Sequence, residues 1–330
     1  MSETHEKLTE TREFGRTRMH ITRVGLGTWA IGGGEWAYAW GPQDDSQSAE
    51  AIHRAAQRGI NWIDTAPVYG TGHSENVVGN AVARLETRPR VFTKVSLIWD
   101  QGRRVRSSLK AESVRSEVAA SRERLKVDKI DLCQIHWPEP EKEIEEGWRA
   151  LADLKDAGEI AHIGVSNFSV GQMERLARIE PVETLQPPFS LIRPEVSKEI
   201  LPYAQEHHIG VIAYSPMYSG LLSGTMTPER IRAMPGDDWR KRDPEFQEPR
   251  LSRNLALSEV LREIGKGHGA SPGEVAIAWT LHHPAVTAAI VGGRSAHQVD
   301  GFVGAAHLRL TQDDIQRIQS FQSEQPPLTA

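Results

Sequence analysis

The stretch INWIDTAPVYGTGHSENVVGNAVARLETRPRVFTKVS, residues 60–96, contains one complete unit of the fold. Two short apolar runs, at 60–66 and 90–96, flank a longer segment at 74–85 that we expect to be helical. Ser74 suits the N-cap of that helix and Glu75 suits its first turn. This order of strand, helix and strand predicts a βα unit with parallel strands.

The same alternation occurs eight times along the chain. The other six apolar runs lie at 23–30, 129–137, 159–168, 182–190, 209–217 and 285–293, each followed by a segment expected to be helical. No Gly/Ser-rich or charged linker divides the chain, and nothing repeats closely enough to suggest a solenoid. We therefore expect an α/β fold, a single-domain (β/α)8 TIM barrel, ahead of a doubly wound sheet with a second domain.

Both ends of the chain fall outside the eight units. We expect residues 1–12 to form a disordered N-terminal tail and residues 13–322 to form the barrel domain. The segment EFGRTRMHI at 13–21 is predicted to be a small hairpin that turns at Gly15 and plugs the barrel bottom. A last helix near 313–322 should pack outside the barrel.

Composition limits the partners and the compartment. The 39 Lys and Arg residues face 44 Asp and Glu residues, and the net charge of −5 argues against nucleic acid as a partner. Cys133 is the single cysteine, so no disulfide can form within the chain, which fits a reducing compartment. No signal peptide or membrane span is evident. We expect a cytoplasmic protein that acts on small molecules without a membrane partner.

The chemistry of a barrel enzyme lies at the carboxyl ends of its strands and in the loops that follow them. In this chain those positions are polar or titratable at every strand. They are Thr28, Trp29, Asp64, Tyr69, Lys94, His136, Ser166, Asn167, Gln186, Tyr214, Ser215, Gly292 and Arg294.

Two of these residues are costly to bury alone. Lys94 and Asp64 end neighbouring strands and can pair with each other, which leaves a purely structural ion pair as the alternative interpretation. Tyr69 can fold back over the barrel mouth, where an adjacent ammonium should favour its phenolate and so lower its pKa. That predicts a general acid or base at Tyr69, with His136 placed to grip a carbonyl oxygen.

Several motifs in the chain resemble those of a known family. In order and spacing the chain resembles the aldo-keto reductases from about residue 16 to 320, through GLGTW (25–29), DTAPVYG (64–70), TK (93–94), His136 in QIHW, GVSNF (164–168), Gln186 and AYSP (213–216). The resemblance implies that Tyr69 donates a proton to the substrate oxygen and that Lys94 lowers the Tyr69 pKa. Asp64 would hold Lys94, and His136 would orient the carbonyl.

The resemblance also implies a nicotinamide cofactor. Ser166, Asn167 and Gln186 would bind its carboxamide, and Tyr214 would stack on its ring. The remaining contacts implied are Thr28 and Trp29 at the ribose or nicotinamide, and Ser215, Met217 and Ser219 at the pyrophosphate.

The eighth turn, IVGGRSAHQVDGF, resembles the family's loop for the adenosine 2′-phosphate. Gly292 would permit close approach, Arg294 would offer a bidentate cation, and Gln298 would reach the adenine. An Arg at this place favours NADP(H), with NAD(H) left open. Many relatives carry a Glu-Asn pair where Gly301 and Phe302 stand here, a departure that weakens the expected adenine contacts.

Two further features surround the expected site. Five tryptophans fall at or beyond strand ends and are predicted to wall a substrate pocket: Trp29, Trp36, Trp40, Trp99 and Trp137. The long, charged and Pro-rich stretch 223–249 is predicted to fold over NADP(H) as a clasp, with Trp239 or Arg240 in contact. The alternative is a mobile surface insert.

The leading hypothesis is an oxidoreductase that transfers a hydride between NADP(H) and the carbonyl of an aldehyde, a ketone or an aldose. One alternative is a regulatory or redox-sensing protein of the same family that binds NADP(H). Another is a hydrolase that uses Asp64 and His136 with a metal. The chain has no HExxH or paired HxH motif, so no metal is expected.

Overall fold

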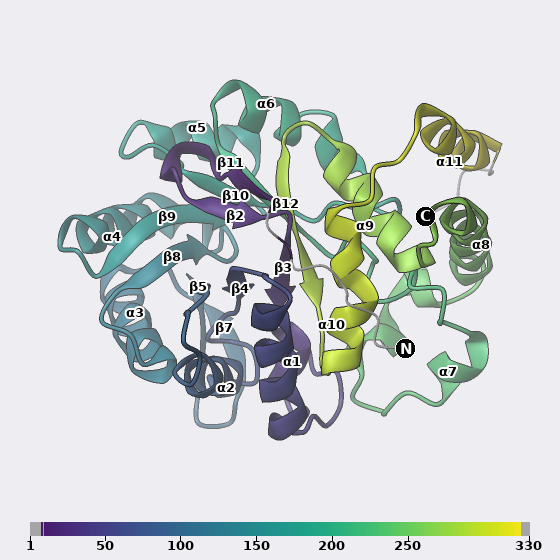
Figure 1. Cartoon of the computed structure of the whole chain (residues 1–330). Coiled ribbons are helices and arrows are strands. Elements are labelled where there is room, and N and C mark those ends of the chain that lie inside the picture. Colours follow the sequence, from purple (N-terminus) through teal and green to yellow (C-terminus); the bar gives the residue numbers. More distant parts are fainter. Residues whose placement is uncertain (1–7, 9, 325–330) are drawn as a thin grey trace.

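The fold is a closed barrel of eight parallel strands, as the sequence predicts (Figure 1). The computed structural model describes residues 8 and 10–324. β12 pairs with β3, with Gly292 opposite Gly27, and this pairing closes the barrel. In spatial order the strands are β3 (Val24–Gly27), β4 (Trp62–Asp64), β5 (Arg90–Val95), β8 (Ile130–Ile135), β9 (Ile160–Ser166), β10 (Thr184–Gln186), β11 (Gly210–Tyr214) and β12 (Val286–Gly292).

Helices surround the strands on the outside of the barrel (Figure 1). The helices that alternate with the strands are α1 (Asp45–Gln57), α2 (His73–Val82), α3 (Ala111–Leu125), α4 (Ile144–Asp156), α5 (Val170–Ala177), α6 (Ile200–Glu206), α9 (Pro272–His282) and α10 (Ala296–Val303). Three more lie outside this set: α7 (Pro228–Arg232), α8 (Arg250–His268) and α11 (Gln312–Glu324). α8 packs against both α9 and α11, so it forms an additional outer layer.

An N-terminal hairpin closes the bottom of the barrel. β1 (Thr11–Glu13) pairs antiparallel with β2 (His20–Thr22), and Phe14 between them is fully buried against Phe92 with ring centroids 5.9 Å apart. Gly15 makes the turn at φ +52°, and a Cβ there would lie 2.1 Å from the backbone nitrogen of Gly210. Only glycine fits at this close approach.

Some boundaries differ from those expected. β1 begins at Thr11, inside the stretch expected to be a disordered tail, and residues 1–7 and 9 of that stretch lie outside the described residues. α2 begins at His73 with Gly72 as its N-cap, so Ser74 is not the cap. The Ser74 hydroxyl instead donates to the carbonyl oxygen and the hydroxyl of Thr28, because the tertiary fold places β3 beside it.

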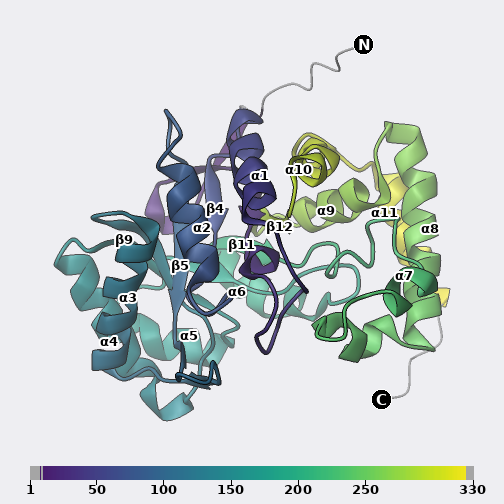
Figure 2. The same ribbon diagram turned by 90° about the horizontal axis from the view of Figure 1, so that it is seen from below.

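Two loops gather at the carboxyl ends of the strands. The segment after β3 and the segment that contains α7 lie side by side in Figure 2, and the Trp239 backbone nitrogen donates to the Ala39 oxygen at 3.2 Å. A small hairpin that the sequence analysis did not anticipate, β6 (Leu97–Trp99) with β7 (Val105–Ser107), follows β5 at the same end. These loops frame the barrel mouth.

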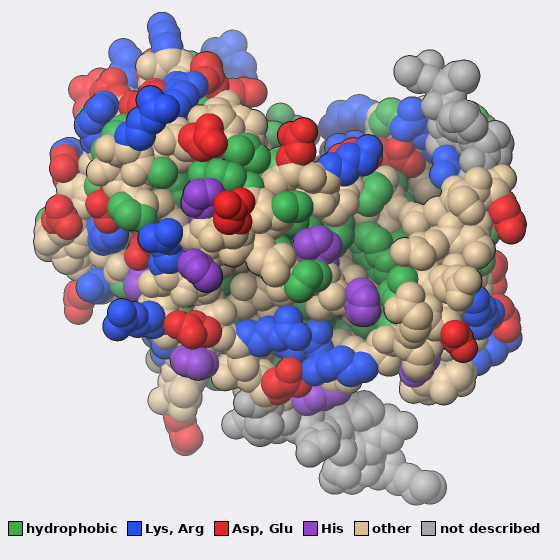
Figure 3. All heavy atoms as spheres, turned by 90° about the horizontal axis from the view of Figure 1, so that it is seen from above, with side chains coloured by type: hydrophobic (Ala, Val, Ile, Leu, Met, Phe, Trp, Pro, Cys, Tyr) green, Lys and Arg blue, Asp and Glu red, His purple; other side chains and the backbone are tan. Residues whose placement is uncertain are grey.

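The surface has no dominant charge on the face that Figure 3 shows, where acidic and basic side chains lie interspersed. Within the described part of the chain, no helix is both long enough and apolar enough to cross a membrane.

Candidate active site

A buried ion pair lies at the centre of the barrel mouth. Lys94, near the end of β5, donates from Nζ to Asp64 Oδ1 at 2.7 Å and to the Thr65 oxygen at 3.0 Å. Its third contact is the Tyr69 hydroxyl at 3.4 Å. Lys94 is fully buried and Asp64 is 2% exposed. The expected Asp64–Lys94 pair is therefore present, and Tyr69 folds back onto it.

Asp64 is held from two further sides. Its Oδ2 accepts a hydrogen bond from Gln186 Nε2 at 2.8 Å, and its backbone oxygen accepts from the Thr28 hydroxyl at 3.0 Å. Burial raises the pKa of Asp64, while Lys94 and Gln186 oppose that shift. The Thr28 side chain, which the sequence predicts to be at the cofactor, is fully buried in this structure and supports the Asp64 backbone.

The pKa of Tyr69 moves in the direction opposite to the one expected. Burial first, and the Asp64 charge second, raise it well above its ordinary value of 10. The sequence predicts that Lys94 lowers this pKa, but Asp64 already neutralises the ammonium in a site shielded from water. At neutral pH Tyr69 is therefore a neutral phenol that can donate a proton.

His136 lies beside Tyr69. The two rings meet edge to face with centroids 5.8 Å apart. Burial and the Lys94 charge lower the pKa of His136 well below 6.5. His136 is therefore a neutral imidazole, which carries one N–H donor and no charge.

The residues expected at the nicotinamide bind one another. The Ser166 hydroxyl donates to the Gln186 backbone oxygen at 2.8 Å, and Asn167 Nδ2 donates to the His136 oxygen at 3.0 Å. The Tyr214 hydroxyl donates to Asn167 Oδ1 at 2.8 Å. Hydrogen bonds of the Ser166, Asn167 and Tyr214 side chains, with the backbone oxygen of Gln186, thus join the ends of β9, β10 and β11.

The loop after β11 holds the residues expected at the pyrophosphate. Ser215 and Ser219 both have positive φ, at 57° and 53°, and the Ser219 oxygen accepts from Arg240 Nη1 at 3.3 Å. Met217 points toward α9, since its sulfur would lie 2.8 Å from a Cβ added to Gly273. Its side chain is partly buried and packs against the hydrophobic core.

Arg294 already has partners. It donates to Gln43 Oε1 and to the backbone oxygens of Trp40 and Pro42, all in the loop after β3. Gln298 Oε1 accepts from the Arg294 backbone nitrogen at 2.8 Å. Gly292 faces open space, since a Cβ added to it would have no neighbouring atom within 4 Å. Arg294 thus joins the eighth turn to the first loop.

The segment 223–249 reaches across the barrel mouth to a group of packed aromatic residues. Trp239 stacks on Trp29 with centroids 5.3 Å apart, and Trp40 packs edge-on against both. The Arg240 guanidinium lies 4.5 Å from the Trp40 ring centroid and pairs with Asp238, which is 1% exposed. We call Trp29, Trp40 and Trp239 the tryptophan cluster. Asp238, which fixes Arg240, was not among the residues predicted from the sequence.

The groups beside the tryptophan cluster suit an anionic cofactor. The indole nitrogens of Trp40 and Trp239 are buried and have no hydrogen-bond partner in the part of the chain that the structure describes. Burial is the main cause that lowers the pKa of Arg294, and the nearby positive charge of Arg240 lowers it further. The two guanidinium groups, both hydrogen-bonded within the protein in this structure, and the two indole N–H groups are donors of the kind that phosphates accept from.

A buried carboxyl behind the site also escaped the sequence analysis. Glu117 of α3 is 8% exposed, and its Oε2 accepts from the Ser96 backbone nitrogen at 3.1 Å. Ser96 has φ +101°, and its hydroxyl accepts from the Trp137 nitrogen at 3.2 Å. Glu117 thereby braces the turns that follow Lys94 and His136. The signal available in the sequence was a Glu among the apolar positions of α3.

The sequence profile of the Aldo/keto reductase family matches residues 23–323. The chain belongs to the aldo/keto reductase family. It is 39% identical over 308 residues to Aldo-keto reductase YhdN of Bacillus subtilis (strain 168), a match that covers 92% of this chain and 91% of that protein. It is 32% identical over 315 residues to the NADH-specific methylglyoxal reductase of Escherichia coli (strain K12), covering 91% and 94%.

A solved structure agrees with this membership. The glycerol dehydrogenase AKR11B4 from Gluconobacter oxydans superposes with a TM-score of 0.86 at 37% identity, covering 97% of this chain and 99% of that one. Aldo-keto reductases are oxidoreductases that use nicotinamide cofactors. The described residues contain no group of three or more His, Cys, Asp or Glu side chains that could hold a metal ion.

Proposed function

We propose that this aldo-keto reductase reduces a carbonyl compound with NADP(H), with Tyr69 as the proton donor. The contact of Tyr69 with the buried Lys94–Asp64 pair carries this proposal. When bound, the nicotinamide supplies the hydride. The neutral Tyr69 phenol gives its proton to the carbonyl oxygen, and Lys94 stabilises the phenolate that remains.

The charge states favour reduction over oxidation near neutral pH. Reduction needs a protonated Tyr69, and burial keeps it protonated by raising its pKa. Alcohol oxidation would start from the phenolate, which the buried site disfavours. With its lowered pKa, the neutral His136 can donate one hydrogen bond to the same carbonyl oxygen without adding a second positive charge beside Lys94.

For the cofactor, we propose NADP(H), with NAD(H) as the alternative. Ser166, Asn167, Gln186, Tyr214 and Trp29 would surround the nicotinamide, and the loop at 215–219 would run along the pyrophosphate. Arg294, assisted by Arg240, would bind the 2′-phosphate after releasing the loop after β3. One relative is named as NADH-specific, so both cofactors need to be tested. We would measure kcat/KM with NADPH and with NADH for wild type and for Arg294→Ala. A selective loss with NADPH supports the proposal.

For the substrate, we propose small polar carbonyl compounds, including α-oxoaldehydes, glyceraldehyde and aldoses, handled in the cytoplasm. Two relatives are named for methylglyoxal and glycerol, which are both small and oxygen-rich. An NADPH-oxidation screen over methylglyoxal, glyceraldehyde, dihydroxyacetone and aldoses tests this, with glycerol as the substrate for the reverse direction. Silence across the screen together with NADPH binding would favour the redox-sensing alternative.

The decisive variant is Tyr69→Phe, which removes only the donor hydroxyl. We expect kcat to fall by a factor of about 10² to 10⁴ while NADPH still quenches tryptophan fluorescence. Tyr203→Phe on α6 is the matched control and should retain wild-type turnover. If Tyr69→Phe turned over at the wild-type rate, Tyr69 would not be the proton donor.

A further inference from the structure

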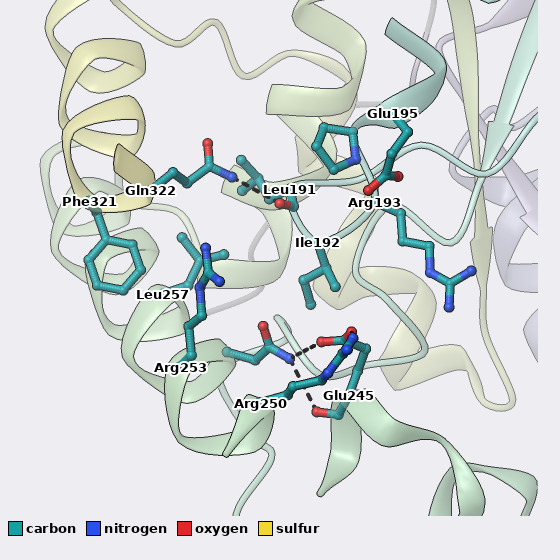
Figure 4. Close-up of a pocket in the computed structure, with 12 residues that line it drawn as sticks. Leu191, Ile192, Arg193, Glu195, Glu245, Arg250, Arg253, Leu257, Phe321 and Gln322 are labelled. Carbon is teal, nitrogen blue, oxygen red and sulfur yellow. Dashed lines mark hydrogen bonds and ion pairs between the residues drawn. The ribbon is translucent and has the colours of Figure 1, made fainter. Parts of the chain in front are cut away.

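A cavity of about 660 Å³ lies on the outside of the barrel, between α8, α11 and the loop at 191–195 that follows β10 (Figure 4). Its lining includes neither the residues around Lys94 nor those expected at the cofactor. Small-molecule sites have volumes of roughly 300–1,000 Å³. The cavity is therefore large enough to be a second binding site, separate from the barrel mouth.

Two of the three arginines in its wall are already engaged. Arg250 Nη1 pairs with Glu245 at 2.6 Å, and Glu245 also accepts from Asn254 Nδ2 at 2.9 Å. The Arg193 guanidinium lies 5.5 Å from the ring centroid of Tyr218. These contacts hold α8 and the two neighbouring loops in place. The positive charges of Arg250 and Arg193 are therefore already engaged within the protein.

Arg253 differs from both. It lies on α8 one turn after Arg250 and is partly buried, and Figure 4 shows its side chain extending from the helix toward the loop that carries Leu191. No hydrogen bond or ion pair joins it to any residue between 10 and 324, or to Leu8. A guanidinium without a protein partner is available to pair with an anion. Its planar fork of N–H donors matches a carboxylate.

An apolar wall adjoins this free cation. Leu257 and Leu191 are buried, and Phe321 of α11 is partly buried beside them. Figure 4 shows the Phe321 ring and Leu257 on the same side of the cavity as Arg253. A ligand that fits would therefore carry an anionic group at one end and an apolar body at the other.

The charges of the lining limit the charge of that ligand. Among residues 8 and 10–324, three Arg and two Glu side chains line the cavity, which gives these side chains a net charge of +1. One carboxylate would balance it. A phosphate monoester, with a charge approaching about −2 at neutral pH, would exceed it and would meet Glu195 and Glu245.

We propose that this cavity binds a small monocarboxylate with an aromatic or branched apolar body. Its carboxylate pairs with Arg253, and its apolar body packs against Phe321 and Leu257. The site takes a ligand that is neither the cofactor nor the carbonyl substrate, and it does not depend on the reaction proposed above.

Isothermal titration of the full chain with phenylacetate tests this proposal, with the neutral phenylacetamide and phenyl phosphate as comparison probes. We expect phenylacetate to bind more tightly than either. Arg253→Met should weaken phenylacetate binding at least about tenfold, and Arg253→Lys should fall in between. Arg262→Met is the matched control, since Arg262 lies on the same helix, outside the cavity lining, and pairs with Glu259 at 3.0 Å.

Three results would overturn the proposal. The first is no heat from wild-type protein with phenylacetate up to its solubility limit, and the second is phenylacetamide binding as tightly as the acid. The third is equal affinity of wild type and Arg253→Met for phenylacetate. That result would be expected if phenylacetate bound at the barrel mouth instead of in this cavity. Thermal melts of each variant show whether it is folded, and Arg253→Lys provides the comparison should Arg253→Met unfold.

Discussion

Replacing Glu117 by glutamine should change how the stability of this protein depends on pH. Burial, the largest effect, raises the pKa of Glu117 to about 8 from an ordinary 4.5, while the Ser96 N–H and Arg124 oppose the rise and Glu75 adds to it. Ser113 and Cys133 are the other polar neighbours. The folded protein therefore holds a proton on Glu117 that the unfolded chain releases.

The sign and size follow from this difference. Between pH 4.5 and about 8 the folded state binds more protons than the unfolded state, so the free energy of unfolding falls as pH rises. Each pH unit in that interval is worth roughly 1.4 kcal/mol, which sets an upper limit of about 5 kcal/mol for the whole interval. Above about pH 8 Glu117 is ionised in both the folded and the unfolded protein, so its contribution to the free energy of unfolding falls no further.

The substituted glutamine side chain would keep an oxygen that can accept from the Ser96 nitrogen, but it would carry no titratable proton. We expect wild type and Glu117→Gln to have similar stability near about pH 5, and the variant to be more stable by a few kcal/mol near about pH 8.5. Urea unfolding followed by circular dichroism measures the difference. Glu112→Gln, in the exposed first turn of the same helix, is the control. A difference between wild type and Glu117→Gln that stayed constant with pH would refute the reasoning.

Three other substitutions test separate parts of the structure. Asp64→Asn leaves the buried Lys94 charge without its counter-charge and should lower the free energy of unfolding by about 3 kcal/mol or more, whereas Asp153→Asn in an exposed pair should cost less than about 1 kcal/mol in the same urea titration. Gly15→Ala forces a Cβ against Gly210 and should destabilise by more than about 1 kcal/mol, whereas Gly171→Ala on α5, where the space is open, should be neutral or stabilising. Trp239→Ala removes the stack on Trp29 and should weaken NADPH binding by roughly tenfold in fluorescence titrations, with Glu229→Ala in the same segment unchanged; equal affinities would show that the segment does not act as a clasp.

Much of the fold follows from patterns within short stretches of sequence. The eight apolar runs are local, and each corresponds to one strand of the barrel, because a strand buried on both faces needs a continuous apolar run. Strand ends are local as well, so Asp64, Lys94 and His136 could be placed at one rim before any contact was known. The hairpin that plugs the barrel was also predicted from a local feature, a turn at Gly15 within residues 13–21.

Contacts between distant segments decided the rest. The pKa of Tyr69 depends on how completely Asp64 neutralises Lys94 and on how much water reaches the site, and neither is written in the spacing of these residues. The Thr28 hydroxyl donates to the Asp64 backbone and accepts from Ser74, a residue 46 positions away in the chain. Arg294 is engaged by a loop 251 residues earlier in the chain.

The sequence by itself therefore determined the barrel, the order of its strands and the residue types at its mouth, because each depends on local periodicity. Only the tertiary structure decided which of those groups are charged, which are already paired and which remain free. Burial and pairing fix the pKa of Tyr69, the partners of Arg294 and, within the described residues, the isolation of Arg253. All three depend on contacts that form only in the tertiary structure.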